Sequence, residues 1–129
     1  HEVILLTKGR KMLKLNEHLK YQVNHFHGSL FDFIYKCHEL LEHNKVINNF
    51  YNQACEVSNS YKSIPQIKHK KLAKIGIETI KTIDRHDNAL AIHLSKCFCR
   101  ILGTIEGTDW QKEVGDILPY KSVQSYHTW

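Results

Sequence analysis

The tripeptide Cys97-Phe98-Cys99 constrains the fold of this chain more than any other stretch. It lies in a run with helical spacing, and residues two positions apart on a helix point about 200° apart and differ by about 3 Å in height. A bond between the two cysteines would need strained, non-helical geometry, so we expect each to bond elsewhere. The candidates are Cys37 and Cys55, the two other cysteines of the sequence.

Either a turn then separates Cys37 from Cys55, or one of the two cysteine pairs stays open. On one straight helix they would lie about 27 Å apart, whereas the Cα atoms of a disulfide lie about 4.4–6.8 Å apart. We predict a break at residues 42–45, with the helices before and after it both packed against the helix of the tripeptide. The pairing stays open between Cys37–Cys97 with Cys55–Cys99 and the crossed arrangement. Helix phase favours the first, because Cys37 and Cys97 both lie on apolar stripes.

The cysteine count also bears on the compartment. Four cysteines in a short chain predict two disulfides and an oxidising compartment, so we expect a secreted protein. The alternative is four reduced cysteines packed as small apolar side chains. The sequence begins at His1, which we interpret as a processed mature chain or one whose leader was trimmed. No stretch is long and apolar enough for a membrane span, so we expect none.

The spacing of the apolar residues predicts an all-α fold. Isoleucine and leucine recur every three or four residues, and the chain has two prolines and six glycines in 129 residues. With 42% hydrophobic residues, the chain is large enough for one buried core. We expect a single domain over residues 1–129, a compact disulfide-stapled bundle of four to six helices. Apolar stripes mark residues 12–26, 30–41, 46–57, 72–83 and 90–105, and a short helix is expected from about residue 109 to Leu118.

Several residues predict where helices begin or touch. Ser29 and Asp32 have the spacing of a capping pair, and Pro65 suits the first position of a helix after the loop at residues 58–65. Residues 108–111 have capping-box spacing as well. Gly76 weakens its helix by roughly 1 kcal/mol relative to alanine, so we interpret it as a point of close contact between helices.

A dense basic cluster is the candidate site for partner binding. It consists of Lys68, Lys70, Lys71 and Lys74, near the start of a helix, where the macrodipole disfavours positive charge. The formal net charge is +5, and an anionic partner is the functional interpretation. The alternative is a solvated face. We do not expect nucleic acid, because the other lysines are spread out and no known binding motif accompanies them.

Metal and catalytic sites are not expected. His93 and Cys97 have i, i+4 spacing, and His25 lies near His27, but this pattern matches the paired ligands of structural zinc poorly. Glycine-rich phosphate loops and hydrolase motifs are missing. Cys37 and His38 are neighbours that point apart on a helix, so they form no dyad. We expect a non-enzymatic protein without a cofactor.

A carrier of a small apolar ligand is the alternative function. Aromatic side chains could line a cavity for it, although ordinary core packing is the favoured interpretation. These residues are Phe26, Phe31, Phe33, Phe50 and Phe98.

Cys97-Phe98-Cys99, in a chain rich in Lys, Asn, Ile, His and Tyr, resembles the Cys-Tyr-Cys motif of the aphid bicycle proteins. These are secreted salivary effectors that insects inject into plants, and the family includes single-motif (unicycle) members. Here Phe98 stands in place of the tyrosine, and one copy is present. The resemblance implies a secreted, non-enzymatic effector that binds a host macromolecule, with structural cysteines. The alternative among secreted helical proteins that bind a macromolecule is a gamete-recognition or cytokine-like helical factor.

Overall fold

The computed structural model describes residues 26–119, and this part of the chain is all helical, as predicted. The helices are α2 (Leu30–Leu40), α3 (Lys45–Ser60), α4 (Pro65–Asp84), α5 (Asn88–Gly103) and α6 (Trp110–Gly115). None of these five has the length and apolarity needed to cross a bilayer. The stripe predicted at residues 12–26 lies outside the described residues, except for its last position, and so does the chain after residue 119.

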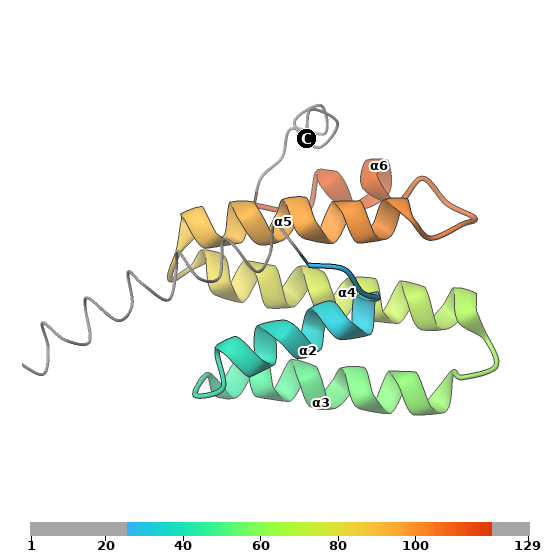
Figure 1. Cartoon of the computed structure of the whole chain (residues 1–129), viewed down its shortest axis with the longest axis horizontal. Coiled ribbons are helices and arrows are strands. Elements are labelled where there is room, and N and C mark those ends of the chain that lie inside the picture. The colour runs from blue at the N-terminus through green and yellow to red at the C-terminus, as the bar shows by residue number, and fades with distance from the viewer. Residues whose placement is uncertain (1–25, 120–129) are drawn as a thin grey trace, which may run out of the picture.

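Helix α4 occupies the middle of the bundle (Figure 1). It packs against α3 on one side and α5 on the other, while α2 covers α3 and α4 and also touches α5. The short helix α6 packs on α5. Because α3 and α5 lie on opposite sides of α4 in Figure 1, α4 separates the two helices.

The helix starts follow local capping chemistry. Ser29 and Asp32 form a reciprocal capping box, as their spacing predicts: the Ser29 N–H donates to Asp32 Oδ2 at 2.9 Å, and the Asp32 N–H donates to Ser29 Oγ at 3.2 Å. Pro65 is the first residue of α4. Asp87 caps α5, and Asp109 caps α6, one residue later than the predicted capping box began.

The break between α2 and α3 occupies residues 41–44, which confirms the turn predicted at residues 42–45. Asn44 explains why α3 begins where it does. Its Oδ1 accepts hydrogen bonds from the backbone N–H groups of Val46 at 3.0 Å and Ile47 at 3.1 Å. An asparagine cap of this kind stabilises a helix by about 1 kcal/mol.

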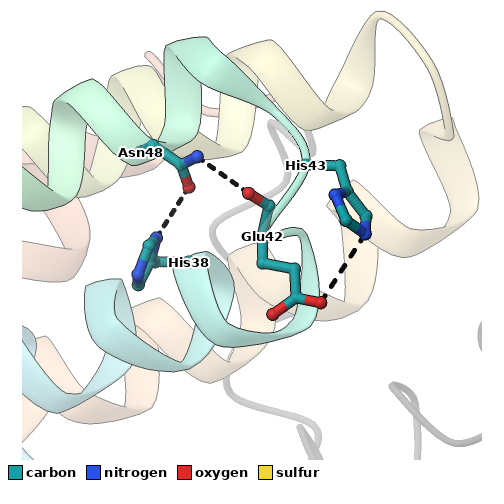
Figure 2. A network of polar contacts seen from close by, with 4 residues as sticks. All are labelled: His38, Glu42, His43 and Asn48. Carbon is teal, nitrogen blue, oxygen red and sulfur yellow. Dashed lines mark hydrogen bonds and ion pairs between the residues drawn. The ribbon is translucent and has the colours of Figure 1, made fainter.

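Asn48 joins the two sides of this turn (Figure 2). Its Nδ2 donates to the backbone carbonyl of Glu42 at 2.8 Å, and its Oδ1 lies 2.7 Å from Nδ1 of His38. Because an amide oxygen only accepts, the His38 Nδ1–H is the donor. The same imidazole stacks on Tyr51, with ring centroids 4.3 Å apart. These hydrogen bonds and the ring stacking therefore stabilise the turn. Its position was inferred from disulfide bonds, but the structure does not need such bonds to explain it.

Phe98 lies at the centre of the core and is fully buried. Its ring contacts Phe33 of α2, with centroids 5.4 Å apart. On α4 the ring rests on Gly76, where an added Cβ would lie 2.3 Å from Phe98 Cε1. The prediction that Gly76 marks a close helix contact is confirmed. The middle residue of the tripeptide thus locks α5 to both α2 and α4.

Candidate partner-binding groove

No disulfide bond joins the four cysteines in the structure. Cys37 on α2 and Cys97 on α5 are both buried and line the same apolar cavity, together with Phe33 and Leu94. This cavity holds about 20 Å³, roughly the space of one water molecule. These two thiols therefore share one cavity, although no two of the four cysteines lie within disulfide-bonding distance in the structure.

Cys55 does not take the position predicted for it. It is half-buried on α3, which packs against α4 and α2. Helices α3 and α5 are not among the extensively packed pairs, so the prediction that both helices flanking the turn pack on the tripeptide is wrong for α3. The reason is that α4 fills the space between them. Cys99 is buried on α5 and is not brought to Cys55.

The buried thiols have little nucleophilic character. Burial raises the pKa of Cys97 to about 11, against the opposing effect of nearby Arg100. Burial, and secondarily Cys97, raises the pKa of Cys37 still further. The thiolate is the reactive form of cysteine, so both groups behave as packed apolar side chains at neutral pH.

Alkylation of the reduced, folded protein tests this description. At pH 8 we expect iodoacetamide to modify half-buried Cys55 well before Cys37 and Cys97, because the latter are shielded and protonated. Peptide mass spectrometry over a time course measures the order, and the same reaction in denaturant is the control, in which the sites react at similar rates. Equal rates in the folded protein would contradict the assigned burial.

The basic cluster divides between two pockets beside α4. Lys70, Lys71 and Lys74 line a groove between α4 and α6, whereas Lys68 lines a different pocket beside Leu72. At about 100° of rotation per residue, Lys68 points roughly 160° away from Lys70 and roughly 120° away from Lys74, but only about 60° from Lys71. The structure therefore brings together three of the four predicted lysines.

The groove between α4 and α6 has a volume of about 430 Å³. Its floor is apolar and buried, and includes Ile77 of α4 and Trp110 and Val114 of α6. Its rim carries Ile67 and Ile117, which are 39% and 48% exposed and are two of the five most exposed large apolar side chains of the described residues. Exposed apolar side chains that converge on one concavity are typical of a binding surface.

Positive charge dominates the rim of the groove. Besides the three exposed lysines, the lining residues include one acidic side chain, Glu113. The first turn of α4 has no acidic residue, and its N-cap, Ile64, offers no side-chain acceptor. The N-terminal half of α4 therefore holds no carboxylate that could compensate the charge of these lysines.

Trp110 is the polar element of the groove floor. Its side chain is 94% buried, and its Nε1–H has no hydrogen-bond partner among the described residues. A buried donor without an acceptor costs about 1–3 kcal/mol. The indole lies at the boundary between the groove and the core, so its fluorescence should respond to whatever occupies the groove.

Residues 26–119 contain no candidate metal site or enclosed apolar-ligand site comparable in size to the groove between α4 and α6. No three His, Cys, Asp or Glu side chains gather closely enough there to hold a metal ion. Of the phenylalanines considered for a ligand cavity, Phe26 and Phe33 line the cavity of about 20 Å³ at Cys37 and Cys97. All of them also pack against other rings or the core: Phe26 on Phe33, Phe31 on Tyr51, Phe33 on Phe98, and Phe50 on the core.

Trp110 and Ile117 were not recognised as site residues from the sequence. Their spacing, with Glu113 and Val114, is the i, i+3, i+4, i+7 pattern of one helix face. This pattern was the available signal, although it does not say which helix α6 will face. The sequence matches no family model, no curated protein and no solved structure in the comparisons made.

Proposed function

We propose that this protein is a non-enzymatic interaction protein that binds a macromolecular partner through the groove between α4 and α6. The observation that carries the proposal is the convergence of Lys70, Lys71 and Lys74 with exposed Ile67 and Ile117 on one concave surface. Exposed apolar side chains can supply affinity for a protein partner, and the charges beside them can supply specificity.

A small-ligand carrier is supported less well. Ligand pockets commonly enclose about 300–1,000 Å³ and bury most of their ligand. The apolar cavity at Cys37 and Cys97 holds about 20 Å³. The groove has a suitable volume, but its rim residues are exposed, so it would leave a small molecule largely in water.

The proposal extends to a secreted effector that acts on a host macromolecule, as the resemblance to the aphid family implies. Oxidation in that compartment would link Cys37 to Cys97, a pairing supported by the cavity that they share. The partner bond, Cys55–Cys99, lacks such support because α4 lies between their helices. Non-reducing peptide mapping of the secreted protein should find the Cys37–Cys97 peptide, and four free thiols would contradict this part of the proposal.

Site-specific photo-crosslinking tests the groove. A benzophenone amino acid placed at Ile117 should form an adduct with a macromolecule from plant tissue, egg envelope or receptor-bearing cells. The same group at Asn52, exposed on α3, is the matched control and should form little adduct. The Ile117 adduct should disappear in the Lys70→Glu/Lys74→Glu variant. The proposed function would be overturned by equal adduct formation at Asn52, or by an Ile117 adduct that persists in the Lys70→Glu/Lys74→Glu variant.

A further inference from the structure

We infer that the segment bound in the groove is an acidic amphipathic α-helix of a protein partner. This inference rests on the proposed function and specifies the chemistry of its partner. Three observations carry it: the shape of the groove, its length, and the sign and spacing of its charges.

The shape of the groove matches a helix. On α4 the lining residues begin with Ile67 and continue through Lys70, Lys71 and Lys74 to Ile77. Opposite them lie Trp110, Glu113 and Val114 of α6 and then Ile117, which follows α6 because this helix ends at Gly115 and not near Leu118 as predicted. The α4 residues share one face of their helix, so the groove is bounded by that face on one side and by α6 with the turn after it on the other. A third helix with an apolar stripe can pack into such a groove.

The length of the groove suits a short helical segment. Ile67 and Ile77 are ten residues apart, which corresponds to about 15 Å along α4. Such a distance accommodates about three turns of a bound helix. Apolar residues of the partner would cover the two exposed isoleucines, Ile67 and Ile117, together with the floor at Val114.

The charges specify an acidic partner. Lys70 and Lys74 are one turn apart on α4, so carboxylates on successive turns of a bound helix can each meet a lysine. Lys70 and Lys74 are also like charges at i, i+4 positions, a spacing at which they repel each other. Carboxylates brought in by a partner would relieve this repulsion. Lys71 also contacts the ring of Tyr61, with Nζ 5.2 Å from its centroid, which leaves Lys70 and Lys74 as the clearest test positions.

Other anions fit less well. A fatty acid carries one carboxylate and could use one turn of lysines, not two. Single-stranded nucleic acid needs exposed aromatic faces for its bases, but Trp110 is 94% buried and the rim carries isoleucines.

Titration with defined probes tests the inference. The probe is a synthetic peptide of about fifteen residues, long enough for partial helicity, with leucine on one helical stripe and glutamate elsewhere. Controls are its scrambled sequence and the same stripe with lysine in place of glutamate. The Trp129→Phe background leaves Trp110 as the single tryptophan, so fluorescence reports on the groove. We expect saturable binding of the acidic helical peptide, weakened by added salt.

Charge variants make the assignment specific. The Lys70→Glu/Lys74→Glu variant should bind the acidic peptide about tenfold more weakly or worse, since like charges then face each other. Glu113→Gln should tighten it by about twofold to threefold. The control Lys45→Glu/Arg85→Glu makes the same change in net charge at exposed sites that do not line the groove, and it should change affinity little. A loss of folding cannot produce the gain expected for Glu113→Gln.

Three results would overturn the inference. They are equal binding of the scrambled or lysine peptide, tighter binding of oleate or of a single-stranded oligonucleotide through Lys70 and Lys74, and affinity that does not respond to Glu113→Gln. If Ile117 crosslinks a macromolecule that the acidic peptide does not displace, the inference fails while the proposed function stands. If adducts form only away from the groove, the proposed function fails.

Discussion

Replacement of Phe98 by alanine should lower the free energy of unfolding by about 3–5 kcal/mol, the usual cost of removing a fully buried phenylalanine. Phe98 is 0% exposed and contacts both Phe33 and Gly76, so the truncation opens a cavity where three helices meet. Small domains are stable by about 5–15 kcal/mol in total. Urea unfolding of the reduced protein, followed by circular dichroism, measures the change.

Phe31→Ala is the matched control for this prediction. Phe31 is half-buried on α2 and contacts Tyr51, with ring centroids 5.9 Å apart, so the same deletion removes less packing. Its expected cost is about 1 kcal/mol. Equal losses for the two variants would show that Phe98 does not have the central role assigned to it.

Gly76→Val should lower the free energy of unfolding by about 2–3 kcal/mol, because added side-chain atoms overpack the contact with Phe98. The Cβ alone would lie 2.3 Å from Phe98 Cε1, far inside van der Waals contact. The Phe98 ring cannot move away freely because Phe33 packs beside it. Valine gains a few tenths of a kcal/mol over glycine in helix propensity, which offsets little of this cost.

A double-mutant cycle isolates the contact. Phe98→Leu shortens the opposing side chain, so Gly76→Val should cost about 1 kcal/mol less in that background than in the parent. Glu78→Val, at an exposed site two residues along α4, controls for the effect of valine on the helix and should change stability by about 0.5 kcal/mol or less. Additive effects of Gly76→Val and Phe98→Leu would refute a direct contact between the two positions.

The helices of the described chain could largely be predicted from sequence because local chemistry sets their limits. Ser29, Pro65 and Asp87 act within one turn of themselves, and apolar spacing marks the faces between them. The turn at residues 41–44 was placed correctly by an argument from disulfide reach. In the structure the hydrogen bonds of Asn44 and Asn48 account for it.

The arrangement of the helices in space was less accessible. Nothing local in the sequence indicates that α4 separates Cys55 from α5, because helix order in a bundle depends on contacts between distant residues. The same limit applies to the site. The lysines were found as a cluster, but their division between two pockets depends on which sides of α4 face α6 and α2. Trp110 and Ile117 join the groove through that packing.

The contact between Gly76 and Phe98 also constrains how this sequence can diverge. The two positions are 22 residues apart. A larger side chain at position 76 fits only if the side chain at position 98 is smaller. Substitutions at them should therefore be correlated among descendants of a common ancestor, even where surface positions have changed completely. A glycine 22 positions before the central residue of a Cys-x-Cys tripeptide is thus a two-point signature by which distant relatives of this chain can be sought.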